Sequence, residues 1–269
     1  MRIADLEQQT PLDKLETRLL LMQVTGFSRI QLITRSEECL TPEQSARFQN
    51  LVARRQHGEP IAYLTGEREF FGLSFYTTPA VLIPRADTEL LVELALQYAA
   101  PDSALLDLGT GSGAIAIALA HQRPDLAVSA VDISSDALQV AQRNADRLLP
   151  PGRISLRQSD WYQAVQGQTF ATIVSNPPYI VQHDPHLQQG DLRFEPLDAL
   201  TDHGDGLSAY RHIISHAADH LSAQGWLLLE HGYDQAAAVR ALLSAAGYSE
   251  VQSWRDLPGI ERVSGAQKR

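Results

Sequence analysis

The first sixty residues carry apolar side chains at the spacing of amphipathic helices. In the first such stretch the apolar positions recur every three or four residues: Leu12, Leu15, Leu19 and Met22. Thr41, Pro42 and Gln44 mark a second helix start, because a cap hydroxyl, a first-turn proline and a glutamine three residues after the cap form a reciprocal capping arrangement. The pattern predicts an all-helical domain over residues 1–65.

The pattern changes after Gly66. Two short runs rich in aromatic residues, 67–71 and 73–77, lie on either side of Gly72. Aromatic residues favour strands, and a glycine between two such runs is typical of a β-hairpin. We therefore predict that residues 66–84 contain a hairpin that links two domains.

Residues 85–269 alternate between apolar strands and amphipathic helices. The predicted strands are 104–108, 127–131, 170–175 and 226–230, and the predicted helices are 114–121 and 135–148. This alternation is typical of a mostly parallel sheet with helices on both faces, so the predicted fold class is α/β. The polar, proline-containing stretch 179–206 is too long for a plain connection, and we expect it to be a functional loop.

A glycine-rich turn follows the first of these strands. Its residues are Gly109, Thr110, Gly111, Ser112 and Gly113. In an open parallel sheet such a turn lies at the carboxyl ends of the strands, where glycines let the backbone approach a bound nucleotide. The spacing also satisfies a dinucleotide-binding pattern, which leaves a nicotinamide or flavin enzyme open. Asp107, two residues before the first glycine, favours a cationic ligand instead, because an acid there would repel a pyrophosphate.

Polar residues after the following strands indicate a nucleoside. Asp132 ends its strand, where a carboxylate can accept hydrogen bonds from both ribose hydroxyls, while Ser134 and Ser135 are better placed to cap the next helix. Asp160 offers an acceptor for the amino group of adenine, and Trp161 offers a flat apolar surface for its ring. A buried tryptophan beside a loop aspartate is the alternative interpretation of this last pair.

The turn Asn176-Pro177-Pro178-Tyr179 directly follows an apolar strand. Two consecutive prolines form a rigid turn whose carbonyl groups point outward. The Asn176 side-chain oxygen and the Pro177 carbonyl can together accept both hydrogens of a planar amino group, and Tyr179 can lie against its face. An amide or base amine is a poor nucleophile, so acceptors that orient it towards an electrophilic methyl group raise its reactivity. These four residues are the predicted catalytic set.

Several of these motifs occur together in one known family. The glycine turn, Asp132 and the turn 176–179 resemble the class I S-adenosylmethionine-dependent methyltransferases that modify planar nitrogens. Residues 82–89, with the aromatic hairpin and the helical domain, are similar to the protein-(glutamine-N5) methyltransferases of peptide-chain release factors, the PrmC/HemK family. The later blocks that also resemble this family are 194–200, 205–207, 229–235 and 256–263. Ala86 and Asp87 depart from it, since the family more often has proline and glutamate there.

The resemblance implies a Rossmann-like class I methyltransferase domain over residues 85–269 that uses S-adenosyl-L-methionine. It further implies methyl transfer to the side-chain amide nitrogen of the glutamine in the Gly-Gly-Gln loop of release factors, with the helical domain recognising that protein. An N6-adenine methyltransferase acting on nucleic acid is the alternative, because the adenine amino group also carries two hydrogens on a conjugated nitrogen. The intact turn 176–179 beside a complete glycine motif disfavours a non-catalytic binding module.

Charge and composition restrict the binding partners and the cellular compartment that the sequence predicts. Lys and Arg number 22 against 32 Asp and Glu, for a formal net charge of −10, so the chain lacks the basic surface that stable nucleic-acid binding requires. Cys39 is the single cysteine, the first thirty residues are not those of a signal peptide, and no apolar run is long enough to span a bilayer. We therefore expect an inert Cys39 and a cytoplasmic protein with no membrane partner.

Histidines provide the remaining candidate chemistry. His212, His216 and His220 recur every fourth residue and would share one helix face. No acidic or cysteine ligand is spaced to complete a metal site, so we predict a polar helix face and no metal. His183 and His186 lie in the polar loop, where we expect them to be solvated.

Overall fold

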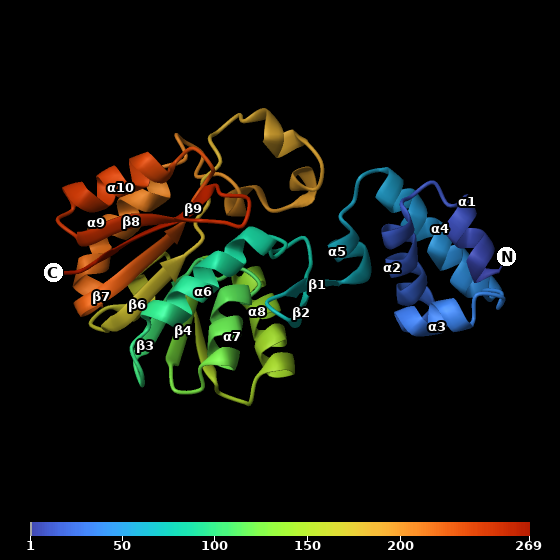
Figure 1. Cartoon of the computed structure of the whole chain (residues 1–269), viewed down its shortest axis with the longest axis horizontal. Coiled ribbons are helices and arrows are strands. Elements are labelled where there is room, and N and C mark those ends of the chain that lie inside the picture. The colour runs from blue at the N-terminus through green and yellow to red at the C-terminus, as the bar shows by residue number, and fades with distance from the viewer. Residues whose placement is uncertain (1) are drawn as a thin grey trace. The chain divides into compact units, whose positions relative to one another are not determined.

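The computed structural model describes residues 2–269, which form two compact units (Figure 1). The first unit comprises the residues up to Glu67 together with Gln189–Phe194, and the second comprises Arg68–Gln188 and Glu195–Arg269. Helices, a hairpin and a seven-stranded mixed sheet follow one another along the chain, which confirms the predicted fold class. No helix in this described part of the chain is long and apolar enough to cross a membrane.

The first unit is built of short helices around a core of leucines. These helices are α1 (Ile3–Gln9), α2 (Lys14–Thr25), α3 (Arg29–Thr34), α4 (Pro42–Gln56) and α5 (Ile61–Thr65). The start of α4 is as predicted: the Gln44 backbone N–H donates to the Thr41 hydroxyl, and the Gln44 side chain accepts from the Thr41 N–H at 3.0 Å. This reciprocal pair satisfies backbone groups that the first helical turn would otherwise leave without partners.

The buried face of α2 differs from the apolar stripe that marks the helix in the sequence. Leu20 and Leu21 are fully buried, whereas Leu15 is 64% exposed. Because residues 19–22 are all apolar, the sequence offers more than one stripe, and contacts with α4 and α5 select the one that enters the core.

The strands β1 (Glu67–Phe70) and β2 (Leu73–Tyr76) form the predicted hairpin. Phe71 and Gly72 at its tip have φ of 51° and 77°. Two consecutive positive φ angles give the tight turn whose twist matches that of the flanking strands. Phe70 and Phe75 are buried against the second unit's own core.

The second unit contains one mixed sheet. Its strands are β3 (Ala104–Leu108), β4 (Ala127–Asp132), β5 (Ile154–Gln158), β6 (Phe170–Ser175), β7 (Leu221–Glu230), β8 (Ser249–Arg255) and β9 (Glu261–Gln267), in the order β5-β4-β3-β6-β7-β9-β8. β3 to β7 run parallel, while β9 pairs antiparallel with both β7 and β8. β3 and β6 have the predicted bounds, but β7 starts five residues earlier than predicted, at Leu221.

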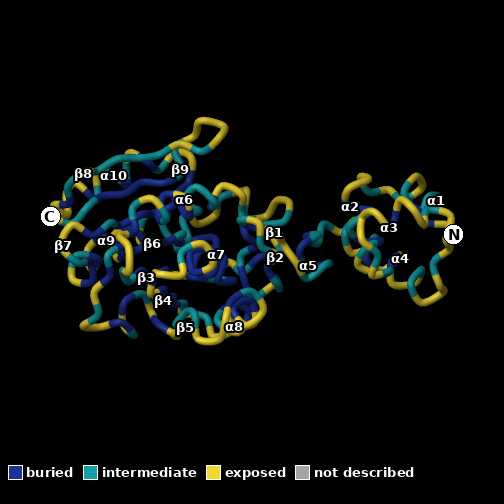
Figure 2. Tube along the Cα trace, turned by 60° about the horizontal axis from the view of Figure 1, so that its bottom comes forward, coloured by how far each residue is buried: buried dark blue, intermediate teal, exposed yellow. Residues whose placement is uncertain are grey.

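Helices cover both faces of this sheet. They are α6 (Glu89–Tyr98), α7 (Ala114–Gln122), α8 (Ser135–Leu148), α9 (Ser208–His220) and α10 (Ala236–Ala245). Apolar residues of α6, α7 and α8 form one core with the sheet, and those of α9 and α10 form a second core on its other face. The sequence of α7 is apolar on every side, and the helix is buried along nearly its whole length (Figure 2). This packing leaves the loops at the strand ends as the available surface for a ligand.

The polar loop 179–206 is folded rather than extended. It contains the short 3₁₀ helices Pro185–Gln188, Leu192–Phe194 and Leu197–Ala199. Its two ends are held together, since the Ile180 N–H donates to the Leu200 carbonyl at 2.9 Å and the Gln182 N–H donates to the Gly204 carbonyl at 2.9 Å. The loop therefore leaves and re-enters the second unit at one place.

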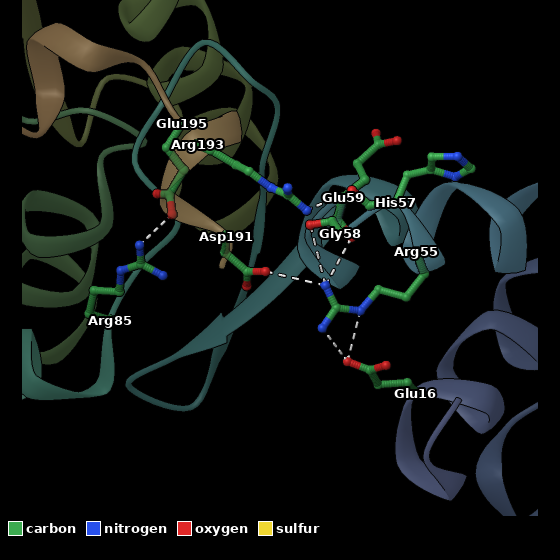
Figure 3. A network of polar contacts seen from close by, with 9 residues as sticks. All are labelled: Glu16, Arg55, His57, Gly58, Glu59, Arg85, Asp191, Arg193 and Glu195. Atoms are coloured by element: carbon green, nitrogen blue, oxygen red, sulfur yellow. Dashed lines mark hydrogen bonds and ion pairs between the residues drawn. The ribbon is translucent and has the colours of Figure 1, made fainter. Parts of the chain in front are cut away.

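The middle of this loop belongs to the helical unit (Figure 3). Asp191 accepts a hydrogen bond from Arg55 at 3.3 Å, and Arg193 donates to the His57 carbonyl at 2.7 Å. Arg55 is held from its other side by Glu16 of α2 at 2.6 Å. Two stretches far apart in the sequence thus share one polar network within the first unit.

Candidate active site

The carboxyl ends of β3, β4, β6 and β7 meet at one edge of the sheet, because these strands are parallel neighbours. The chain runs from β3 through β4 to β5 on one side and then returns to place β6 on the other side of β3. This reversal between β3 and β6 is the position at which open α/β sheets bind ligands. The residues predicted for the cofactor and for catalysis follow these same strand ends.

The glycine turn after β3 is a compact backbone structure. The Gly109 and Thr110 N–H groups both donate to the Val131 carbonyl of β4, at 2.9 and 3.0 Å. An added Cβ at Gly111 would meet no atom within 4 Å, and one at Gly109 would meet only Trp161, at 4.0 Å. The space beside both glycines is therefore open to a ligand.

Gly113 differs from the other two glycines of the turn. An added Cβ there would lie 2.8 Å from Ile117 and 3.2 Å from the Cβ of Ala141 on α8. Its φ of 81° also lies in the region that favours glycine. The structure places Gly113 at the close packing of α7 against α8 instead of at the open side of the turn.

Asp107 is fully buried beneath this turn. One carboxyl oxygen accepts a hydrogen bond from the Thr110 hydroxyl at 2.7 Å, and the other has no hydrogen-bond partner within residues 2–269. Burial raises the pKa of Asp107 to about 7, although the Thr110 hydrogen bond opposes the shift. A buried carboxyl group with an unused acceptor atom is suited to a positively charged ligand group.

Asp132 joins the ends of β3 and β4. Its carboxylate accepts from the Gly111 N–H at 2.8 Å and from the Ser134 N–H at 2.9 Å. Burial raises the pKa of Asp132, and these backbone hydrogen bonds oppose that effect. Ser134 caps α8 by accepting from the Ala137 N–H at 3.1 Å, so Asp132 is not the cap of that helix.

A hollow lies beyond Asp132, at the ends of β4 and β5. Its lining is provided by Ile133, Gln158, Ser159, Asp160, Gln163 and Ala164. Ile133 is 65% exposed, which makes it an apolar surface beside the acceptor atoms of Asp160. Ile133 is not among the residues predicted from the sequence, although an apolar residue directly after the strand-end acid is a usable signal. Trp161 lies against Gly109 and near His212 and does not line this hollow.

The turn 176–179 follows β6, and its shape is held from several sides. The Ser175 hydroxyl donates to the Leu108 carbonyl at 2.7 Å, which fixes the start of the turn against β3. The Gln235 side chain donates to the carbonyls of Tyr179 and Gly206, at 3.0 and 3.1 Å. Gly206 approaches Tyr179 so closely that an added Cβ would lie 2.5 Å from the Tyr179 carbonyl oxygen. The turn is consequently preorganised.

The segment 82–89 also contributes to this edge of the sheet. Glu195, which is buried, pairs with Arg85 and accepts from the Ile83 N–H at 2.9 Å. The Asn176 side-chain NH₂ donates to the Thr88 hydroxyl at 3.4 Å.

Burial raises the pKa of Tyr179, and the nearby Glu230 carboxyl adds to this shift. Glu230 ends β7 and is a buried acid within the block 229–235, for which the sequence predicted no role of its own.

The histidines of α9 have different surroundings. His220 is buried, and its ring stacks on Tyr162 with the ring centroids 4.6 Å apart. The prediction of one polar, solvated helix face is therefore wrong for His220, because this ring packs against another aromatic ring instead of facing water. His212 and His216 stack on each other at 4.5 Å. Within residues 2–269, no three histidine, cysteine or acidic side chains form a group that could hold a metal ion.

Comparison with known proteins gives matches over nearly the whole chain. Family models match at residues 3–66, for the PrmC N-terminal domain, and at residues 85–192, for the methyltransferase small domain. A Burkholderia pseudomallei protein named release factor glutamine methyltransferase is 55% identical over 273 residues, which cover 98% of this chain and 95% of that protein. The Escherichia coli protein of the same name is 50% identical over 250 residues, 93% of this chain and 90% of that protein. A methyltransferase structure from Pyrococcus furiosus, 21% identical, has a TM-score of 0.57 over 82% of this chain and 98% of that chain, which supports the fold.

Proposed function

The chain belongs to the release factor glutamine methyltransferase family, and from this premise we propose that its turn 176–179 holds the side-chain amide of a release-factor glutamine for methylation. The single observation that carries the proposal is the position of Asn176. It follows β6 directly beside the glycine turn of β3, at the reversal of strand order. A cofactor in the open space at that turn and an amide at Asn176 would be neighbours.

The enzyme uses S-adenosyl-L-methionine, which supplies an electrophilic methyl group on a sulfonium centre when it is bound. The residues present fit this cofactor: Asp107 has an unused buried acceptor, and Gly109 and Gly111 have open space beside them. In the proposed complex Asp132, which accepts from the Gly111 N–H, also accepts hydrogen bonds from the ribose, and Asp160 lies in the hollow next to it. The whole proposed cofactor set is Asp107, Gly109, Thr110, Gly111, Ser112, Gly113, Asp132, Asp160, Trp161 and Asn176. Gly113 acts within it through packing.

The catalytic residues act by position and electrostatics. Asn176 Oδ1 and the Pro177 carbonyl accept the two amide hydrogens, Pro178 keeps the turn rigid, and the Tyr179 ring lies against the amide plane. These contacts fix the nitrogen that attacks the methyl group. An alkylated amide nitrogen loses its proton readily to water, so no side chain of the turn has to act as a general base.

The helical unit is proposed to bind the release factor outside its glutamine loop. Large apolar side chains on α2 and α3 are exposed: Leu15 at 64%, Ile30 at 73% and Ile33 at 60%. Exposed apolar groups on one small unit support a protein partner. The same unit includes Gln189–Phe194, ten residues after the catalytic turn, which links recognition to the active site along the chain.

A protein substrate also agrees with the charge of the chain. The net charge of −10 disfavours the phosphate contacts that an adenine methyltransferase needs. We propose that the enzyme forms no stable complex with nucleic acid or with a membrane, and that it works in the cytoplasm, where its single cysteine stays reduced.

The proposal is tested by incubating the enzyme with labelled S-adenosylmethionine and, in parallel, intact release factor, tRNA and DNA. Mass mapping of the products should place the label on the side-chain nitrogen of a Gly-Gly-Gln glutamine. Label on an adenine base would replace the proposed substrate by nucleic acid. If neither the release factor nor the nucleic acids carry label after the incubation, the proposal as a whole is contradicted.

A further inference from the structure

Glu230 is a buried carboxyl group at the edge of the sheet where the site lies. It ends β7, is 2% exposed, and follows the buried leucines of that strand. Its Oε2 atom has no hydrogen-bond partner within residues 2–269. Burying an acid that is only partly hydrogen-bonded costs free energy, so the groups that surround Glu230 should indicate its role.

Thr88 connects Glu230 to the catalytic turn. Thr88 is 5% exposed, and its hydroxyl is close enough to the Glu230 carboxyl to lower the pKa of that acid by hydrogen bonding. The same hydroxyl accepts the side-chain N–H of Asn176 at 3.4 Å. Thr88 directly precedes α6 and does not cap it through its side chain, so its hydroxyl has no role in the helix start.

The chemistry of Glu230, Thr88 and Asn176 determines which group donates and which accepts in each hydrogen bond between them. An ionised carboxyl group can only accept hydrogen bonds, so the single Thr88 hydroxyl proton points to Glu230. The oxygen of Thr88 is then left with lone pairs only, and it can only accept from Asn176. The Asn176 carboxamide is held with its NH₂ towards Thr88 and its oxygen turned away from it.

We propose that Glu230 and Thr88 are positioning residues that fix the Asn176 carboxamide so that its oxygen faces the substrate amide. This inference rests on the proposed function, in which the Asn176 oxygen accepts an amide hydrogen of glutamine. With the carboxamide rotated by half a turn, Asn176 would present N–H groups to the N–H groups of the substrate. Neither Glu230 nor Thr88 needs to touch the substrate for this effect.

The ionisation of Glu230 controls this orientation. The groups around it are Arg85, Asp87 and Thr88 of the segment before α6, Arg262 of β9, Tyr179, and Tyr210 of α9. Burial raises the pKa of Glu230 to about 7, while the Thr88 hydrogen bond and the two arginines oppose the rise. Below this pH the protonated carboxyl group can donate to Thr88, which frees the Thr88 proton to point at Asn176. Both orientations of the carboxamide then become possible, and the rate of the chemical step falls.

The first test compares Thr88→Val, Thr88→Ser and Thr172→Val, with intact release factor and saturating cofactor at pH 8. Thr172 is a matched control, because it is fully buried in β6 and its hydroxyl has no hydrogen-bond partner within residues 2–269. Thr88→Val should lower kcat by about tenfold or more, as expected for loss of a preorganising hydrogen bond, with the KM for cofactor nearly unchanged. Its melting temperature should also fall, because the buried Glu230 carboxyl loses a hydrogen-bond partner. Thr88→Ser should restore kcat to within about threefold, since it keeps the hydroxyl. Wild-type kcat in Thr88→Val, or an equal loss in Thr172→Val, would overturn the inference.

The second test is the pH profile of kcat for the wild type and Glu230→Gln. The wild-type kcat should rise between pH 6 and pH 8, and the variant should lose this dependence because its amide does not titrate in that range. An unchanged profile in Glu230→Gln would overturn the inference. Asn176→Ala separates the two proposals: a slow Asn176→Ala with a fast Thr88→Val contradicts only the positioning role, whereas a fast Asn176→Ala contradicts the proposed function itself.

Discussion

The carboxylate of Asp132 accepts a hydrogen bond from the backbone N–H of Gly111 at 2.8 Å. The residue that ends β4 therefore holds the turn that follows β3. In the proposed complex the same carboxylate also receives the ribose hydroxyls, so it links the shape of the glycine turn to recognition of the nucleoside. A substitution of Asp132 should therefore affect cofactor affinity in both ways.

We predict that Asp132→Ala weakens the affinity for S-adenosylmethionine by about 2–3 kcal/mol, because hydrogen bonds to a charged group are the stronger ones. Isothermal titration calorimetry measures the change directly. Asp136→Ala is the matched control, since Asp136 is an exposed aspartate in the first turn of α8. Equal affinities for wild type and Asp132→Ala would show that the ribose is bound elsewhere.

Asn176→Ala should lower kcat by about a hundredfold or more, comparable to the loss of one preorganised polar group in an active site. The affinity for cofactor should change much less, because the variant leaves the turn 109–113 intact. Single-turnover rates with intact release factor, paired with calorimetry, separate the two effects. Tyr179→Phe should be milder, since the ring face that lies against the amide is kept. A Tyr179→Phe enzyme slower than Asn176→Ala would assign the main role to the phenol hydroxyl.

The affinity for S-adenosylmethionine should depend on pH through Asp107. Its pKa of about 7 means that the carboxyl group is neutral below that pH and negative above it. Because the cofactor carries positive charge, affinity should rise with pH, by about tenfold between pH 6 and pH 8 if only the ionised form binds tightly. Asp107→Asn should bind more weakly at pH 8 and show no such rise. A pH slope that persists in Asp107→Asn would assign the titration to another group.

The sequence predicts local features better than contacts between distant segments. The capping pair of Thr41 and Gln44 and the bounds of β3 and β6 follow from neighbouring residues, and the structure has them as predicted. Strands β8 and β9 could not be predicted, because neither shows a regular alternation of buried and exposed residues that would identify it alone. Their place in the sheet depends on strand pairing, since β9 pairs with both β7 and β8. The position of Glu230 beside Thr88 depends on β7 meeting the start of α6, which no local pattern encodes. The burial of His220 against Tyr162 could not be predicted either, because this contact also joins segments that are distant in the sequence.

Intact release factor should be methylated far better than a glutamine peptide, because contacts remote from the glutamine contribute binding energy that a peptide lacks. The double variant Ile30→Ser with Ile33→Ser should lower kcat/KM for the intact factor and leave the rate on the peptide unchanged. Both side chains are more than half exposed on α3, so their loss does not disturb the core. Steady-state rates on both substrates provide the measurement. Equal values of kcat/KM for peptide and factor would contradict recognition by the helical unit.

Gly111→Ala should mainly weaken cofactor binding, whereas Gly113→Ala should mainly lower stability. At Gly113 a methyl group adds a clash with Ile117 and Ala141 to an unfavourable positive φ, so we expect a loss of about 2–4 kcal/mol of stability. At Gly111 the φ of 56° costs an alanine about 1–2 kcal/mol, and no atom lies within 4 Å of the added group.

The methyl group of Gly111→Ala would occupy the open space beside the turn, so this variant should lose affinity for cofactor with a smaller drop in melting temperature. Gly113→Ala should melt earlier, and its folded fraction should still bind cofactor. Thermal melting followed by calorimetry below the melting range tests both statements. A Gly113→Ala enzyme that melts like the wild type and fails to bind cofactor would show that Gly113 faces the ligand, and that the packing of α7 on α8 tolerates a side chain there.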